Sequence, residues 1–394
     1  MNQNTFLFLL GISILLIGLS KCSYSTKSCT KTCSPTTCTF NSGVVCGSSS
    51  MPSTNFDVGA QVTAVPCKQC TQSSDSRCSS DFLASTFAIG STHVKAAYCN
   101  DAFLVIWSDG LPQHSSTYLS DIPNPPGADG CLMRTNVKQS LAFKIPLTTT
   151  PLATGAKNIL ATYPNNELPL SGAIGVAVNG VPMYPTLDAS NLDIWTACEA
   201  DLCNAHAGKG ADYHYHGDPF GTGCLYTEKD VKNNHPIVIG FSLDGYTIYG
   251  RHTSADQDGQ AIALDRCGGH THGTYGYHYH TELVEGTKHT QYFMGPSYCW
   301  TGDISKIANF WDKEQHQAEF DNSFTNPKFT PSGRQDYELL KPCCSSTTGY
   351  LTTGATLNGS TLTASTTTTT GSTTGSGFIK IISTILAGLL FFLL

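Results

Sequence analysis

The chain has 394 residues, of which 13% are charged, and its formal net charge is −7. This charge excludes the basic surface that nucleic-acid binding requires, so we expect no nucleic-acid partner. The low share of charged residues and the abundance of Ser, Thr and Gly favour a loop-rich β protein over one built on long helices.

Both ends of the sequence have the composition of processing signals. Residues 1–22 contain an apolar run followed by small residues, as a secretory signal peptide does. Residues 377–394 end in an apolar run, and small residues and a polar spacer precede it. That order is typical of a GPI-anchor signal, the alternative being a tail-anchored or single-span protein. We therefore expect a secreted protein on the outer face of the plasma membrane, held there by a lipid anchor.

The cysteine content fits an oxidising compartment. The chain has 17 cysteines, and an even number remains if Cys22 leaves with the signal peptide. Such a set in a secreted protein indicates disulfides rather than half a zinc site at Cys67 and Cys70. Residues 23–80 are rich in cysteine and poor in apolar residues, so we interpret them as a cross-linked arm.

Beyond the arm, short apolar runs alternate with turn signals. Runs over residues 102–107, 141–146, 174–178 and 237–243 are typical of strands, and the last two lead into Asn-Gly and Asp-Gly turns. No stretch of this region has a sustained helical period. We therefore predict an all-β domain over residues 81–302, mainly antiparallel and built as a sandwich or barrel-like pair of sheets.

The rest of the chain is predicted to support this domain. Residues 303–344 form a C-terminal flank with one short helix near residues 305–320. Residues 345–376 are mostly Ser, Thr and Gly and carry a glycosylation sequon at Asn358, so they are expected to form a stalk.

One motif of the β domain occurs twice. The block Tyr213-His-Tyr-His216 returns as Tyr277-His-Tyr-His280, with an aspartate, a cysteine and a histidine at matching upstream positions. The turn at Asn179-Gly returns at Asp244-Gly. A unit of about 65 residues is therefore duplicated, over residues 171–236 and 237–302.

The alternation of Tyr and His predicts a strand with two unlike faces. His214 and His216 share one face, with Cα atoms about 6.7 Å apart, and the two tyrosines share the other. Two such imidazoles can converge on one ion, with a third nitrogen expected from the loop. A set of nitrogen ligands suits Zn²⁺ or Cu²⁺. The predicted ligands are His206, His214, His216, His270 or His272, His278 and His280, with His114 as a further candidate.

Several alternatives stay open for these histidines. The spacing fits one four-His site near a pseudo-twofold axis, two three-His sites, or histidines that only form hydrogen bonds. Asp218 and Glu282 follow the blocks on the histidine face. A straight strand puts Asp218 about 13 Å from His214, so it is expected to orient an imidazole or to act as a base for a metal-bound water.

Each copy also has one cysteine before its block and one after it. We predict the bridges Cys203–Cys224 and Cys267–Cys299, each closing a loop over its own histidines.

The two Y-H-Y-H blocks resemble those of the YHYH-domain proteins, a family of secreted and surface proteins. The resemblance runs from about residue 92 to residue 300 and includes residues 108–114, 175–184, 235–245 and 264–270. It implies a β-rich secreted domain and no settled activity.

The function predicted first is metal binding at the cell surface through the duplicated histidine clusters. The ion would serve either hydrolysis by metal-activated water or simple metal capture, and the sequence does not decide whether the protein is an enzyme. The alternative is a non-catalytic adhesion or coat protein with a disulfide-stapled domain. Nucleophile elbows, phosphate loops and dinucleotide fingerprints have no match in the sequence.

Overall fold

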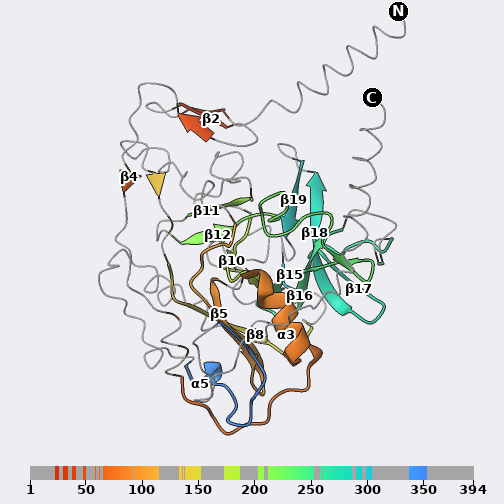
Figure 1. Ribbon diagram of the computed structural model, residues 1–394. Coiled ribbons are helices and arrows are strands. Elements are labelled where there is room, and N and C mark those ends of the chain that lie inside the picture. The colour runs from red at the N-terminus through yellow and green to blue at the C-terminus, as the bar shows by residue number, and fades with distance from the viewer. Residues whose placement is uncertain are drawn as a thin grey trace, which may run out of the picture. The chain divides into compact units, whose positions relative to one another are not determined.

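The computed structural model (Figure 1) describes part of the chain, all of it within the compact unit Met1–Leu362. The described residues are 23–25, 30–33, 38–40, 48–49, 58, 62, 65–90, 92–114, 133–134, 136, 138–151, 173–186, 203–207, 212–252, 258–259, 261–285, 290–294, 299–303 and 337–352. The signal peptide, the helix near residues 305–320, most of the stalk and the GPI-anchor signal lie outside them.

The structure is mostly β-sheet, which confirms the predicted fold class. In the arm, β1 (Ser23–Ser25), β2 (Thr30–Cys33) and β3 (Cys38–Phe40) form an antiparallel sheet. A further pair is made by β4 (Ser48–Ser49) and β7 (Met133–Arg134).

One antiparallel sheet has four strands, of which one comes from the first residues of the predicted stalk. In sheet order its strands are β20 (Tyr350–Leu351), β5 (Val94–Cys99), β6 (Phe103–Ser108) and β8 (Leu141–Pro146). Every residue of β6 and β8 is buried. The sequence of β6 is apolar up to Ser108, which is the pattern of a strand covered on both faces, whereas β8 contains Lys144, which is buried as well.

A nine-stranded sheet contains both Y-H-Y-H blocks. In sheet order its strands are β11 (Ala205–Ala207), β12 (Tyr213–Tyr215), β10 (Pro182–Met183), β9 (Gly175–Ala177), β15 (Val238–Ser242), β16 (Thr247–Arg251), β18 (Gly276–Glu285) and β17 (Gly269–His272), and β19 (Thr290–Met294) also pairs with β18. Most pairs are antiparallel, as predicted, but β10–β12 and β16–β18 are parallel.

The duplication gives this sheet a pseudo-twofold arrangement. The central strands β9 and β15 are antiparallel, and Val176 lies opposite Phe241, its counterpart in the other copy. The strands on either side of this pair follow in the same order. The Y-H-Y-H strands β12 and β18 therefore have four strands between them, which separates them by about 24 Å. This arrangement excludes one shared four-His site.

Helix α3 (Ser80–Phe87) packs between the two sheets (Figure 1). It begins after Ser79, whose hydroxyl accepts a hydrogen bond from the Phe82 amide and so satisfies one of the amides that have no partner within the helix. The Phe87 ring lies 6.1 Å from that of Tyr350 and 5.9 Å from that of Phe241. One buried ring thus contacts both sheets.

Disulfides join segments that are distant in the sequence. Cys67 pairs with Cys344 and Cys70 with Cys343, bridges that span 277 and 273 residues. Cys78, at the end of the 3-10 helix η1 (Ser76–Cys78), pairs with Cys99 on β5. The last part of the predicted arm is therefore cross-linked to the β domain.

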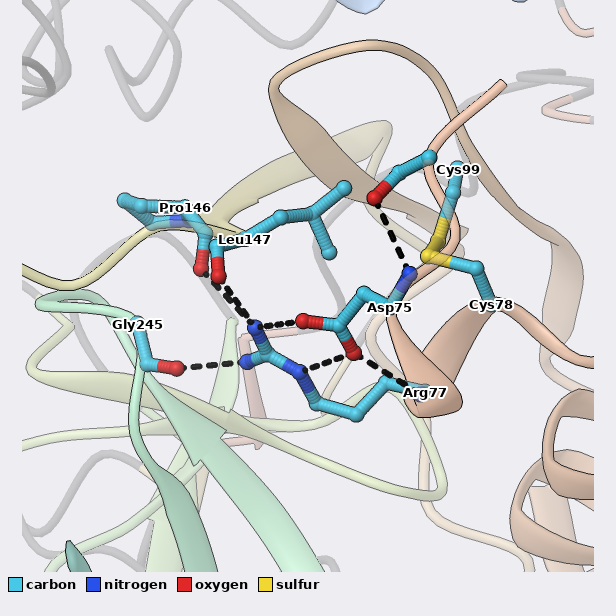
Figure 2. Close-up of polar contacts among 8 residues, drawn as sticks. Asp75, Arg77, Cys78, Cys99, Pro146, Leu147 and Gly245 are labelled. Carbon is cyan, nitrogen blue, oxygen red and sulfur yellow. Dashed lines mark hydrogen bonds and ion pairs between the residues drawn. A yellow bond between two sulfur atoms is a disulfide. The ribbon is translucent and has the colours of Figure 1, made fainter. Parts of the chain in front are cut away.

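Arg77 holds the same region to the duplicated unit (Figure 2). Its Nη1 donates a 2.6 Å hydrogen bond to the Gly245 carbonyl, and its Nη2 donates one of 2.9 Å to the Leu147 carbonyl. Asp75 accepts hydrogen bonds from Nε and Nη2 on the opposite edge of the guanidinium. One cation thus connects η1, the end of β8 and the Asp244-Gly245 turn.

The remaining described elements are short. They are the 3-10 helix η2 (Ala88–Gly90), the helix α5 (Tyr337–Leu340), and the paired strands β13 (Val231–Lys232) and β14 (His235–Pro236). Within the described part of the chain, no helix has the length and apolar character needed to cross a membrane.

Candidate metal centres

Three histidines of the first copy converge, and we call His206, His214 and His216 the first centre. The antiparallel pair β11–β12 puts His206 directly opposite His214. The Nε2 atom of His216 lies 2.9 Å from that of His214 and 3.1 Å from that of His206. All three side chains are buried, and their ligand atoms lie within 4.8 Å of one another. The first centre is therefore a geometrically possible metal site.

Backbone carbonyls fix the tautomers of two of these three histidines. The Nδ1 atom of His214 donates to the Asp212 carbonyl at 3.0 Å, and that of His216 donates to the Pro185 carbonyl. Because a carbonyl can only accept, each Nδ1 carries the hydrogen, and the Nε2 of each neutral ring has a lone pair. Two lone pairs thus point at each other across 2.9 Å.

A cation between these nitrogens would remove that repulsion. A proton is disfavoured, because burial and the neighbouring His214 hold the pKa of His216 well below its usual value. The Asp212 carboxylate lies 3.2 Å from the Nδ1 of His214, where it orients the ring. A carboxylate or carbonyl on the far nitrogen is the common partner of a metal-binding imidazole.

Four histidines converge at the second Y-H-Y-H strand, and we call His235, His272, His278 and His280 the second centre; His235 comes from the end of the first copy. Their ligand atoms lie within 4.8 Å of one another, and all four are buried. The Nε2 atoms of His278 and His280 are 3.0 Å apart. Their Nδ1 atoms donate to the Gly276 and Gly250 carbonyls at 2.9 and 2.7 Å. The facing lone pairs of the first centre are therefore repeated here.

Burial keeps three of these imidazoles neutral. It lowers the pKa of His278 to about 3 and that of His235 to about 4, and it holds the pKa of His280 well below the usual value. Neutral nitrogens are what a metal ion requires of histidine.

Both His270 and His272, the two alternatives for the third ligand, lie at or beside the second centre. His272 belongs to the second centre, and the ring of His270 lies 4.8 Å from those of His272 and His278. His270 donates from Nδ1 to the Ile262 carbonyl at 3.0 Å, and its buried Nε2 has no hydrogen-bond partner among the described residues.

His235 is the ligand candidate that the sequence analysis missed. It lies on β14, outside the repeated block, and its Nδ1 donates to the Pro236 carbonyl at 2.8 Å. It lies at the end of the first copy, and the matching position of the second copy has no histidine, so the repeat gives no signal for it. Only the crowding of histidines in the second half of the chain points to it.

A tyrosine covers each centre at matching positions. The Tyr184 ring stacks on His214 at 4.0 Å with an interplanar angle of 24°. Its counterpart Tyr249 contacts His278 at 5.0 Å and His280 at 5.9 Å. These rings pack against the imidazoles and restrict their orientation.

The tyrosines of the blocks lie on the other face, as the alternation predicts. Tyr215 and Tyr279 are fully buried; Tyr215 accepts a hydrogen bond from the Asn179 amide at 2.9 Å. His114 contacts this face, with its Nε2 3.0 Å from the Tyr215 hydroxyl and its ring edge-on to Tyr213. The structure therefore places His114 behind the strand and not in the first centre, because the loop reaches the tyrosine face.

The Asp218 carboxylate contacts an arginine and a tyrosine. Its carboxylate lies 2.5 Å from the Arg251 Nε and accepts a 2.7 Å hydrogen bond from the Tyr226 hydroxyl. Burial raises its pKa to about 6, although Arg251 acts in the opposite direction. Its described contacts include no imidazole, because an arginine of the other copy reaches the carboxylate. Glu282 lies on β18 opposite Phe293, and its side chain is outside the described part.

The cysteines around the blocks form the pairs that their spacing predicts. Cys203 is bonded to Cys224 and Cys267 to Cys299, with Cα atoms 5.4 and 5.0 Å apart. A third group of possible ligands, Cys70, Asp101 and Cys343, has no free thiolate, because the two cysteines are bonded to each other.

The repeated Y-H-Y-H strand is also the feature that carried the family resemblance. Residues 142–263 match the family model described as YHYH protein. The resemblance to the YHYH family is confirmed. The YHYH match contains the first Y-H-Y-H block and His235 and ends before the second block. No curated protein and no solved structure matches the chain.

Proposed function

We propose that this chain is a lipid-anchored surface protein that holds a transition metal ion in each of its two histidine centres. The observation that carries the proposal is the pair of facing Nε2 atoms in each copy, 2.9 Å apart for His214 and His216 and 3.0 Å apart for His278 and His280. The Nδ1 atom of each of these four rings donates to a carbonyl. The facing Nε2 atoms are therefore acceptors only.

The spacing of the nitrogens supports a small divalent ion. Two imidazoles that bind one tetrahedral ion at 2.0–2.1 Å have their nitrogens about 3.3 Å apart. The observed Nε2 separations are a few tenths of an ångström shorter, so binding would need only a slight outward movement of the rings.

The ligand chemistry supports Zn²⁺ or Cu²⁺. The cysteines that flank the two blocks are in disulfides, so nitrogen is the donor that the centres offer. Imidazole suits both ions. Holding the metal is better supported than hydrolysis, because Asp218, the base expected from the sequence, is bound by Arg251 and Tyr226.

The location rests on the sequence. An apolar N-terminal segment, an apolar C-terminal tail behind small residues, and disulfides throughout the domain support secretion and a GPI anchor. The Ser/Thr/Gly stalk with its sequon at Asn358 supports glycosylation and distance from the membrane. Release of the protein from intact cells by phosphatidylinositol-specific phospholipase C tests the anchor.

Metal analysis of the purified full chain tests the centres. We expect two ions per chain, with one lost in His214→Ala/His216→Ala, one lost in His278→Ala/His280→Ala, and both lost in the quadruple variant. His114→Ala is the matched control, because this buried histidine contacts the opposite face and should leave both ions bound. A folded wild type without metal would instead support the adhesion or coat protein.

A further inference from the structure

We infer that the second centre binds Cu²⁺ in a square-pyramidal shell of five imidazoles, with His270 as the fifth ligand. This inference rests on the proposed metal binding, and it adds the identity and the coordination geometry of the ion in one of the two centres.

His270 has the position in the second copy that His206, a ligand candidate of the first centre, has in the first. Each lies directly opposite the first histidine of its block, His206 opposite His214 and His270 opposite His278. The ring centroids of these two pairs are 4.6 and 4.8 Å apart. The repeat therefore brings His270 to its block as it brings His206 to the first one.

The Nε2 atom of His270 is available to an ion. Its Nδ1 donates to the Ile262 carbonyl at 3.0 Å, so its Nε2 has a lone pair. This Nε2 is buried, and within the described part of the chain it has no hydrogen-bond partner. The same holds for the Nε2 of His235, whose Nδ1 donates to the Pro236 carbonyl. A buried acceptor without a donor costs about 1–3 kcal/mol, which a bound cation would recover.

The five imidazoles have the arrangement of a square-based pyramid. Four of them form a closed cycle in which neighbouring centroids are 4.8–5.2 Å apart, in the order His235, His272, His270 and His280. The His278 ring lies 4.8–5.3 Å from each of these four. One donor adjacent to four others that follow one another in a cycle is the relation between the apex and the base of a square pyramid.

The separation of the nitrogens fits right angles at the ion. Nitrogens bound to one ion at about 2.0–2.1 Å lie about 2.8–3.0 Å apart at 90°, and about 3.3 Å apart in a tetrahedron. The Nε2 atoms of His278 and His280 are 3.0 Å apart. A square pyramid therefore accepts these two rings where they stand, whereas a tetrahedron requires them to move outward.

This geometry selects the ion. Tetragonal nitrogen coordination is typical of Cu²⁺ and Ni²⁺, and Cu²⁺ binds more tightly in the order of divalent ions. Structural Zn²⁺ sites are almost always tetrahedral, with four ligands. Five imidazoles at right angles thus favour Cu²⁺ beyond the general preference of nitrogen ligands for copper.

Electron paramagnetic resonance of the copper-loaded full chain tests the geometry. The variant His214→Ala/His216→Ala isolates the second centre. We expect it to bind one Cu²⁺ per chain with an axial spectrum, a large copper hyperfine splitting and superhyperfine lines from nitrogen, as a tetragonal nitrogen shell gives. A tetrahedral shell would give a rhombic spectrum with a small copper splitting.

His270→Ala in the same background tests the fifth ligand. The affinity for Cu²⁺ should fall by more than about tenfold, the loss that removal of an outer-shell partner already causes. The affinity for Zn²⁺ should fall less, because four imidazoles complete a tetrahedral shell. His252→Ala is the matched control, since its ring lies 5.3 Å from that of His270 and its Nε2 is 3.0 Å from the Ile262 carbonyl. It removes an imidazole beside the five and should leave the copper affinity unchanged.

A rhombic spectrum, or equal copper affinities of His270→Ala and His252→Ala, would overturn the inference and leave the proposed metal binding intact. Binding of zinc without copper would do the same. A folded wild type that binds neither ion would overturn the proposed function as well. If the background variant does not fold, the wild type decides: one of its two copper signals must be axial, and it must change in His270→Ala but not in His252→Ala.

Discussion

Tyr279 donates a 2.6 Å hydrogen bond to the buried carboxylate of Asp244, at the place where Tyr215 accepts one from the amide of Asn179 in the other copy. The hydrogen-bond networks behind the two Y-H-Y-H strands thus differ by one ionisable group, Asp244. Burial raises the pKa of Asp244, since hydrogen bonds from Tyr279 and the Gly302 amide only partly offset the loss of hydration.

Asp244→Asn is therefore expected to stabilise the protein at pH 8. The folded-state pKa of Asp244 lies above the unfolded value, so the wild type loses stability as the pH rises through that pKa, and the variant does not. The advantage of the variant should shrink as the pH falls to about 4, near the unfolded pKa. Urea unfolding of both proteins across this range measures it. The reciprocal Asn179→Asp should destabilise at pH 8, and a stabilising effect of that change would contradict the argument.

Arg77→Ala should lower the free energy of unfolding by about 2–4 kcal/mol. The substitution leaves the Gly245 and Leu147 carbonyls and the Asp75 carboxylate without their charged donor, in a site where the Arg77 side chain is 13% exposed. Arg77→Lys should recover only part of the loss, because the Lys ammonium lacks the planar set of donors that the Arg guanidinium presents.

Thermal or urea unfolding compares these variants with Lys232→Ala, a surface cation on the exposed strand β13. Equal stability of Arg77→Ala and Lys232→Ala would show that the Arg77 contacts contribute nothing.

Gly259→Ala should remove or weaken metal binding at the second centre and spare the first. A methyl group at this position would overlap the His272 ring and force the imidazole away from its neighbours. Metal content in the His214→Ala/His216→Ala background measures the loss directly. Gly223→Ala is the control for backbone strain, because Gly223 has φ +83° and open space around its Cβ position. Equal metal loss in both variants would point to general destabilisation.

The bridge Cys203–Cys224 closes a loop with a separation of 21 residues over the first centre. Cys203→Ser/Cys224→Ser should cost about 3 kcal/mol of stability by the chain-entropy relation. It should also weaken metal binding at the first centre, because the strand that carries His206 follows Cys203 directly. Peptide mapping without reduction checks the pairing, and a Cys203–Cys267 link would refute it.

Features with a local cause could be predicted from the sequence. The period of two in a strand puts His214 and His216 on one face and the tyrosines on the other, whatever the rest of the fold does. His206, which was expected in a loop, lies instead on β11, directly opposite His214 in a hairpin. The pairing of each cysteine across its own block follows from the same short loops.

Features that depend on sheet order could not be predicted. The order of the nine strands puts four of them between β12 and β18, and this separates the two centres. The same order brings Arg251 to Asp218 and so removes the expected base from the imidazoles. The loop carrying His114 reaches the tyrosine face, although its spacing to Tyr215 of 101 residues carries no geometric information.

The sequence by itself determined that imidazoles are presented twice from one side of a strand, because side-chain direction in a strand is a local property. Only the tertiary structure decided how many imidazoles each centre collects. His235 reaches the second centre through β14 and the packing of its ring on Tyr249 and Tyr275, contacts between segments that no local pattern encodes.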